Sequence, residues 1–241
     1  MKTGGRTATF TLQDVVAAGT RIGLADLTIQ GVADALGVTS AAIYRHVPSR
    51  SALDSLVGEA ILAELTIVDD PAEPTATALV GFAAQLRRFT LAHPGTAQYL
   101  QRLFPRGPSG IRLLEEQIAN LGRRGYDPAA ATVLSSAIAT IALGIAAAEE
   151  ARAVHALLDP RGDDEATRAA LAAMAGSPLL QVAREGIPSH TADDYFLLLL
   201  TAAADGLVTH LPPGRPVTSL SLRHPVTATG EQDFTATGEQ D

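Results

Sequence analysis

The sequence predicts an all-α protein made of a small N-terminal domain and a larger C-terminal helical domain. Apolar residues recur at the i, i+3, i+4, i+7 spacing of an amphipathic helix in successive segments. Residues that suit helix N-caps precede many of these segments, and Gly or Pro follows them. An acidic stretch with two prolines, residues 69–76, divides the segments into two groups, and 241 residues suffice for two modest buried cores.

The first helix is expected over residues 11–21, because Thr11 is a suitable N-cap and the apolar residues after it share one face. That face would cover the next two helices from behind, and it consists of Leu12, Val15, Val16 and Ile22. Residues 1–10 are polar and contain glycine, so we expect them to be disordered without a partner.

Two short helices joined by a tight turn are expected next, which together make a helix-turn-helix. Thr28 is a natural N-cap for the first of them, and Gly37 ends it where a left-handed residue is needed. Thr39 or Ser40 then caps the second, which ends near His46. The apolar positions that packing explains are Ile29, Val32, Ala33, Leu36, Val38 and Ile43.

Packing does not explain the outward face of the second short helix. Its side chains are short or hydrogen-bonding, which suits a backbone that approaches base edges in a major groove. We expect Arg45 to reach guanine O6 and N7, and Tyr44 and Arg50 to hold phosphates on either side. The residues expected to contact DNA are Thr28, Gln30, Thr39, Ser40, Ala41, Tyr44, Arg45, His46 and Arg50.

At these residues the sequence resembles the tetracycline-repressor (TetR) family of one-component regulators. The resemblance depends on LTIQGVADALGVTSAAIYRHVPSRSALDSLV, from Leu27 to Val57, and on the capped helix TLQDVVAAGTRIGL before it. Two departures are Arg50, where the family usually has Lys, and Gly31, which lies in a helix interior. The resemblance implies an N-terminal three-helix DNA-binding domain, placed at 1–58, and a C-terminal helical domain that binds a ligand and dimerises.

A longer helix is expected over residues 49–68, with Leu53, Leu56, Val57 and Ile61 on one stripe. In the family this helix swings and changes the distance between recognition helices, and the resemblance implies the same here. We therefore assign residues 59–74 to a connector helix and linker.

The effector-binding and dimerisation domain is expected at residues 75–211. Pro94 and Gly95 break its first helix, and Pro128 begins its longest one. A loop is expected over Asp159–Arg168, followed by weaker helices. The expected helices are 75–93, one ending at 104, 109–124, 127–158, two between 163 and 186, and 191–210.

Two of these helices suit a dimer seam. The helix from Ala129 to Leu158 is rich in small residues, which permit close helix approach, and the helix from Thr191 to His210 is apolar around nearly its whole circumference. Pairing with each other on one side and with a second subunit on the other gives a four-helix homodimer interface, as the resemblance also implies.

Aromatic residues are scattered over the helices that must converge in the second domain. Ordinary core packing explains most such residues, but in the family this domain commonly encloses a cavity for an apolar effector. His93 could hydrogen-bond such a ligand or stabilise a helix end. The candidate ligand-binding residues are Phe82, Leu86, Phe89, His93, Tyr99, Phe104, Gln117 and Phe196.

The formal net charge of −8 lies entirely outside the first 60 residues, where five basic residues balance five acidic ones. We therefore expect modest non-specific DNA affinity and reliance on dimerisation. The chain has no cysteine, and its start lacks the apolar segment of a signal peptide, so a cytoplasmic protein is expected. Ser135, Ser136 and Thr140 interrupt the alanine-rich stretch 129–148, which favours a buried helix over a membrane span.

No catalytic residue, metal site or cofactor is predicted. The sequence has no Ser-His-Asp order, phosphate-binding Gly loop or H-E-x-x-H motif. The acidic run Asp163–Glu165 has no second cluster to face, and Glu149, Glu150 and His155 are not at metal-ligand spacing. Residues 212–241, which end in a repeated TATGEQD, are too polar to form a core and are expected to be a disordered tail.

The leading hypothesis is a homodimeric transcriptional repressor that binds a palindromic double-stranded operator and leaves it when a small-molecule effector binds. The alternative is a helical enzyme or small-molecule carrier with an incidental helix-turn-helix. The second hypothesis gives the groove-facing residues no purpose.

Overall fold

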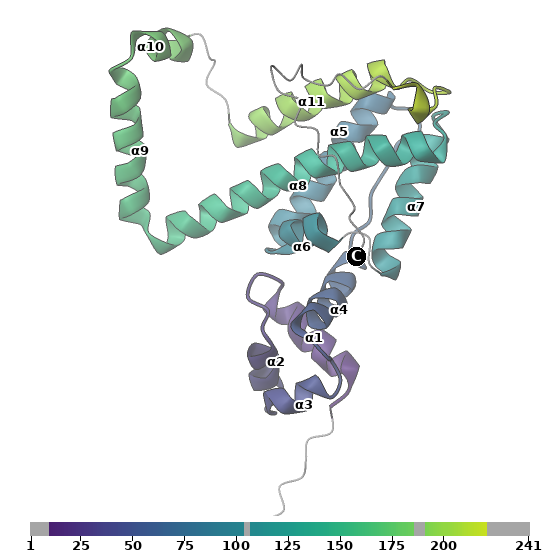
Figure 1. The fold of residues 1–241 in the computed structure, drawn as a ribbon, viewed down its shortest axis with the longest axis vertical. Helices are drawn as coiled ribbons and strands as arrows, with labels where there is room; N and C mark the ends of the chain where they lie inside the picture. The colour runs from purple at the N-terminus through teal and green to yellow at the C-terminus, as the bar shows by residue number, and fades with distance from the viewer. Residues whose placement is uncertain (1–9, 104–106, 186–190, 221–241) are drawn as a thin grey trace, which may run out of the picture.

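The computed structural model describes residues 10–103, 107–185 and 191–220, and within these ranges it contains eleven α-helices, one short 3₁₀-helix and no strand. The predicted all-α fold class is confirmed. Helices α1–α4 form a small N-terminal bundle, and the remaining helices form a larger body beyond the far end of α4 (Figure 1). The interpretations of residues 1–9, of Phe104 and of residues 221–241 lie outside the described residues.

Local capping explains the first three helices. Helix α1 (Leu12–Ile22) begins with a capping box in which Thr11 and Asp14 bond each other's backbone N–H, and this bonding lowers the pKa of Asp14. Helix α2 (Ile29–Leu36) is capped by Thr28 and ends at Gly37, whose φ of 67° is left-handed. Thr39, of the two candidates, caps α3 (Ser40–Tyr44). The helix-turn-helix is present as predicted.

The N-terminal bundle has a dry core, formed by apolar residues from all four of its helices. Leu12 is 40% exposed, so it contributes less to this core than its place on the expected stripe suggested. The side chains with at most 1% exposure are Val15, Ala18, Leu27, Val32, Ala33, Ile43, Val47, Leu53, Val57 and Leu62.

Helix α4 (Arg50–Leu62) is shorter than predicted, because it ends at Leu62 and not at Val68. The guanidinium of Arg112 donates hydrogen bonds to the carbonyls of Leu62 (3.3 Å) and Leu65 (3.0 Å). These bonds satisfy carbonyls that the helix end leaves free, so the chain can leave the helical path while Leu65 stays buried.

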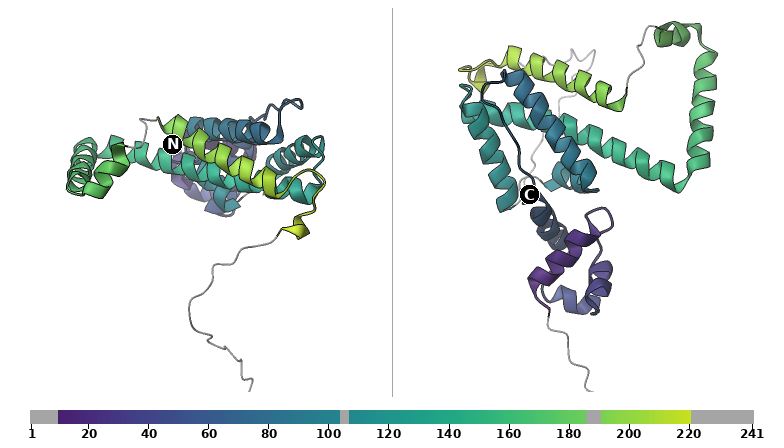
Figure 2. Two further views of the ribbon diagram at one scale, coloured as in Figure 1. Left: turned by 90° about the horizontal axis from the view of Figure 1, so that it is seen from above. Right: turned by 180° about the vertical axis from the view of Figure 1, so that it is seen from behind.

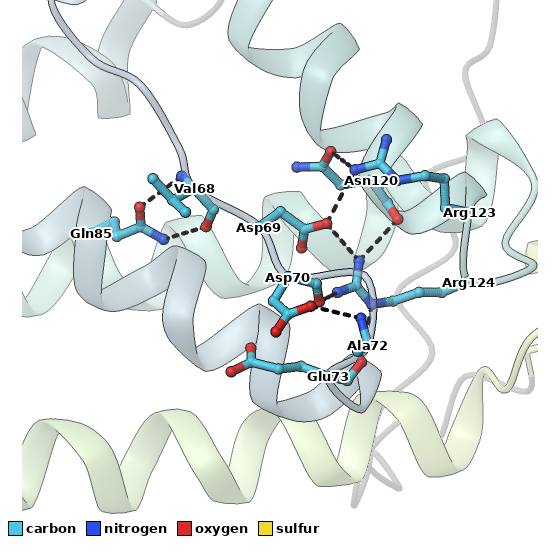
Figure 3. A network of polar contacts seen from close by, with 9 residues as sticks. All are labelled: Val68, Asp69, Asp70, Ala72, Glu73, Gln85, Asn120, Arg123 and Arg124. Atoms are coloured by element: carbon cyan, nitrogen blue, oxygen red, sulfur yellow. Dashed lines mark hydrogen bonds and ion pairs between the residues drawn. The ribbon is translucent and has the colours of Figure 1, made fainter.

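The segment between α4 and α5 is fixed by polar contacts from other helices (Figure 3). The amide of Gln85 pairs with both the backbone N–H and the carbonyl of Val68, at 2.8 and 2.9 Å. The Asp69 carboxylate accepts from Arg124 at 3.0 Å and from Arg123 at 3.2 Å. The linker is therefore held against α5 and the end of α7.

The C-terminal body is built around α8 (Pro128–Leu158), which packs against α5 (Thr75–Ala92), α6 (Thr96–Leu103), α7 (Pro108–Gly122) and α11 (Ala192–His210). Its core contains Leu79, Leu134, Ile138, Phe196 and Leu200, each at most 1% exposed. Among the described helices, only α8 is long and apolar enough to cross a membrane, and here much of its apolar surface packs against other helices.

The loop predicted over Asp159–Arg168 is wrong, because α9 (Pro160–Ala175) occupies most of it. Pro160 is the first helical residue and the Asp159 side chain accepts from Gly162 N at 3.0 Å, which together start a helix. Helix α10 (Pro178–Glu185) follows, and the two form an arm that extends from the end of α8 away from the rest of the body (Figures 1 and 2).

The expected tail also begins later than residue 212. Residues 217–219 form a 3₁₀-helix, and Val217 and Leu220 pack against the core of the C-terminal body. The Gly214 N–H donates to the Gly125 carbonyl at 3.0 Å. Apolar side chains in this segment supply the packing that composition alone did not suggest.

Arg124→Ala should destabilise the protein much more than Arg123→Ala. Both guanidinium groups reach the same Asp69 oxygen, but the Arg124 side chain is 6% exposed and that of Arg123 is 49% exposed. Arg124 also donates to the backbone carbonyls of Asn120 and Asp70. We expect a loss of about 2–4 kcal/mol in the free energy of unfolding for Arg124→Ala and less than about 1 kcal/mol for Arg123→Ala. Urea denaturation measures both, and similar losses would contradict the assigned role of burial.

Candidate DNA interface and ligand cavity

The outer face of α3 is open to solvent at the end of the molecule farthest from α11 (Figure 1). Ala42 and Ile43 of α3 are buried, whereas Tyr44 is 51% exposed and Ala41 and Arg45 are also exposed. Within the described residues, Tyr44 and Arg45 form no hydrogen bond or ion pair, so both are available to a partner. This face is exposed, as the sequence predicted, and its contact with DNA stays a prediction.

Other predicted contact residues have structural partners. Thr28 and Thr39 cap their helices with their side-chain oxygens. The Ser40 hydroxyl donates to Gln30 Oε1 at 2.6 Å, and Gln30 Nε2 donates to Asp34 at 2.6 Å. This chain of bonds fixes the start of α3 against α2. Gln30 and Ser40 therefore help to position α3.

Two further residues flank α3. The His46 ring lies against Phe10, with 4.7 Å between ring centroids. Arg50 Nε pairs with Asp54 at 2.7 Å in an i, i+4 ion pair, although the Arg50 side chain is still 44% exposed. An exposed pair of this kind contributes little to stability, so Arg50 can exchange Asp54 for a phosphate.

The second domain encloses a cavity of about 430 Å³ between α5, α6, α7, α8 and the end of α4. Three of the predicted ligand residues, Phe82, Leu86 and Gln117, line it. The remaining lining residues are Leu62, Leu65, Ile67, Leu100, Gln101, Leu113, Leu114, Ser135, Ser136, Ala139, Thr140 and Leu143. The polar interruptions in the alanine-rich helix were the sequence signal for Ser135, Ser136 and Thr140.

Four other candidates lie elsewhere. Tyr99 packs on Gly58 of α4, where a Cβ would overlap its ring. Phe89 contacts the His93 ring at 4.3 Å, and His93 Nδ1 bonds the Phe89 carbonyl at 2.9 Å, so His93 stabilises a helix end. Phe196 is in the second core, with the Arg87 guanidinium 4.8 Å from its ring centroid. Phe104 is outside the described residues.

Arg87 joins three helices of the C-terminal body. It donates to Glu149 of α8 and to Asp193 of α11, each at 2.8 Å. The hydrogen bond to Glu149 is the main reason that the pKa of Arg87 is raised above its usual value. Among the described residues, no group of three or more His, Asp or Glu side chains is arranged to hold a metal ion.

The cavity and α3 are joined by short paths. Helix α4 starts directly after the turn that follows α3, and its last residue, Leu62, lines the cavity. A second contact runs through the loop between α5 and α6, where the Pro94 carbonyl accepts from Ala25 N at 3.2 Å. In the same loop, Gly95 N donates to Glu150 of α8 at 2.7 Å.

Residues 70–211 match the family model described as "Tetracyclin repressor-like, C-terminal domain". One curated relative, an HTH-type transcriptional regulator of Saccharopolyspora erythraea, is 27% identical over 153 residues. That alignment covers 63% of this chain and 61% of the relative, so the chain spans about three fifths of the relative's length.

Solved structures share the fold. ActR of Streptomyces coelicolor in complex with actinorhodin is 24% identical, with a TM-score of 0.67 and coverage of 84% of this chain and 98% of that one. Apo ActR of Streptomyces coelicolor is 23% identical with a TM-score of 0.62, and the match covers 84% of this chain and 98% of that one. A TetR variant from Acinetobacter baumannii in complex with minocycline is 20% identical with a TM-score of 0.58, and the match covers 83% of this chain and 98% of that one.

Gly95→Ala should destabilise the contact between the two domains. Gly95 and Gly214 have similar positive φ values of 84° and 78°, so Ala at either position adds backbone strain. A Cβ at Gly95 would also lie 2.5 Å from Ala25 N, whereas nothing lies within 4 Å of one at Gly214. We expect Gly95→Ala to cost about 2–5 kcal/mol and the control Gly214→Ala about 1–2 kcal/mol in chemical denaturation. Equal costs would argue against a tight contact at Gly95.

Proposed function

The chain belongs to the TetR family of transcriptional regulators, and from this premise we propose that it is a ligand-responsive repressor that a small-molecule effector releases from a palindromic operator. The family model covers residues 70–211, which is more than half of the chain. The observation that carries the proposal is the course of α4, which runs from the turn after α3 to the wall of the cavity.

The coupling needs only a difference in effector affinity between two geometries. Leu62 and Leu65 line the cavity, and Leu53 and Val57 of the same segment are buried in the N-terminal core. An effector that fits the cavity better after the end of α4 has moved will favour that position, and α3 moves with it. The complexes of ActR with actinorhodin and of the Acinetobacter protein with minocycline support a small molecule as the effector.

DNA binding is assigned to the exposed face of α3. Tyr44 and Arg45 are exposed and unpaired within the described residues, and Arg50 follows at the start of α4. In a homodimer, two such helices about 34–36 Å apart would read successive major grooves of a palindrome. Since the first 60 residues carry balanced charge, specific contacts and dimerisation must supply most of the affinity.

A second copy of the chain is the partner that we assign to the open face of α8 and α11. On α11, Tyr195, Leu197 and Leu198 are 48%, 45% and 65% exposed, and on α8 Val154 and Leu157 are 48% and 80% exposed. An apolar surface of this kind on a protein in water favours association. We further propose that the protein is cytoplasmic and has no enzymatic activity.

Arg45→Ala should weaken binding to a selected operator by about 1–3 kcal/mol and relax its specificity, because Arg45 is assigned to a base edge. Tyr44→Ala should weaken specific and non-specific duplex binding alike, since Tyr44 is assigned to a phosphate. The operator is obtained by selection from a random duplex library, and affinity is measured by fluorescence anisotropy at several salt concentrations.

The control for both substitutions is Arg168→Ala, which removes an exposed arginine of α9 far from α3 in the structure. Arg168→Ala should leave operator affinity unchanged. If the two α3 variants bind as tightly as the unmodified protein, the assigned docking face is wrong.

Leu198→Glu should convert the dimer to a monomer and abolish tight operator binding. The side chain is 65% exposed in one subunit, so the subunit itself should still fold, while a charge in the middle of an apolar interface is unfavourable. Ile111→Glu places the same change on an exposed apolar residue of α7, at 49% exposure, and should leave the dimer intact. Sedimentation velocity measures the oligomeric state of both variants. If Leu198→Glu remains a dimer, the proposed interface is wrong.

A further inference from the structure

The cavity in the C-terminal body has a neutral wall. Ten of its fifteen lining residues are apolar, and the other five are the uncharged polar residues Gln101, Gln117, Ser135, Ser136 and Thr140. No Asp, Glu, His, Lys or Arg is among the described residues that line it. An ion that entered would lose its water without gaining an opposite charge, and a chelated metal would find no side-chain ligand of its usual kinds.

Gln117 is the buried polar group of this wall that lacks a partner. It is only 6% exposed, and its side-chain amide forms no hydrogen bond within the described residues. Its buried polar neighbours are satisfied: Ser135 donates to the Ala131 carbonyl at 2.7 Å, and Asn120 accepts from Arg123 at 2.6 Å. Because this amide lines the cavity and has no partner within the described residues, its N–H and carbonyl groups are available to a group that a ligand supplies.

Three other polar residues of the cavity lie toward solvent. Gln101, Ser136 and Thr140 are exposed and also line the cavity, so they mark its open side. Phe82, Leu86, Leu113 and neighbouring leucines make up most of the remaining wall. The cavity therefore fits a molecule with an apolar body and one hydrogen-bonding group that faces Gln117.

We propose that the cavity selects an uncharged, mostly apolar molecule whose carbonyl or hydroxyl group bonds the Gln117 amide, and that it discriminates against organic anions of the same shape. Its volume of about 430 Å³ lies within the range of cavities that hold drug-sized ligands. The inference deepens the proposed function, because it takes this ligand to be the effector.

Three probes with one aromatic body test the charge preference by fluorescence titration of the full chain. They are the methyl ester of anthracene carboxylic acid, the carboxylate itself and ethylanthracene. The ester should bind at least about tenfold more tightly than the carboxylate, because the cavity offers the carboxylate no counter-charge. Equal or tighter binding of the carboxylate would overturn the proposal.

Gln117→Leu tests the buried amide. It should weaken ester binding about 2- to 10-fold, the usual effect of one net hydrogen bond, and leave ethylanthracene binding unchanged or tighter. Gln101→Leu makes the same change at the exposed opening and should alter neither probe by more than about twofold. Circular dichroism verifies folding, and Gln117→Met provides a second apolar replacement of similar length. If Gln117→Leu and Gln117→Met weaken both probes equally, the amide has no selective role.

Ala139→Trp fills the cavity and should abolish binding of the ester. Retained binding would place the probe outside the cavity and would also overturn the proposal. Operator binding is measured separately, so the two failures are distinguishable. If the protein binds no duplex but prefers the ester, the ligand assignment stands and the repressor assignment is wrong. If it binds the operator but does not prefer the ester, the repressor assignment stands and the ligand assignment is wrong.

Discussion

The structure depends on one continuous apolar cluster that joins the two domains, with α4 at its centre. Leu53, Val57 and Ile61 of α4 belong to the same buried cluster as Val15 of α1 and as Leu100 and Leu143 of α6 and α8. Gly58 permits the close approach of α4 to the Tyr99 ring. Because tightly packed interiors transmit small displacements, the proposed displacement of the far end of α4 would carry the N-terminal bundle with it.

A second cluster provides the frame against which the proposed movement of α4 would occur. Leu79, Ile138, Phe196 and Leu200 tie α5, α8 and α11 together without any residue of the N-terminal bundle. Arg87 adds ion pairs across the same three helices. Phe82 packs against both clusters and lines the cavity, which therefore lies at the boundary between the frame and the part that carries α4. A ligand at such a boundary can change the relative position of the two parts without disrupting either core.

The sequence predicted several helix ends that neighbouring residues determine, although it missed the locally capped start of α9 at Asp159 and Pro160. It also failed where distant residues decide. Thr28, Gly37 and Asp127 mark helix ends through contacts within a few residues, so the helix-turn-helix and the start of α8 were correctly placed. The predicted end of α4 was wrong because Arg112, fifty residues away, binds the carbonyl of Leu62. Helical spacing likewise identifies the apolar face of a helix but not which other helices that face contacts. The sequence therefore could not distinguish Phe82, which lines the cavity, from Phe196, which is buried in a separate core.

The contacts that α7 makes with the end of α4 give α7 a part in the proposed coupling between the cavity and α3. The Glu59 carboxylate of α4 accepts from Ser109 N at 2.7 Å, and Arg112 holds the carbonyls of Leu62 and Leu65. Gln117 lies on the same helix, in the cavity wall. The proposed ligand would therefore bond a residue of the helix that holds the end of α4, and its apolar body would contact Leu62 directly. Under the proposed mechanism, the position of α4 would depend both on where the ligand places its polar group and on the size of its apolar body.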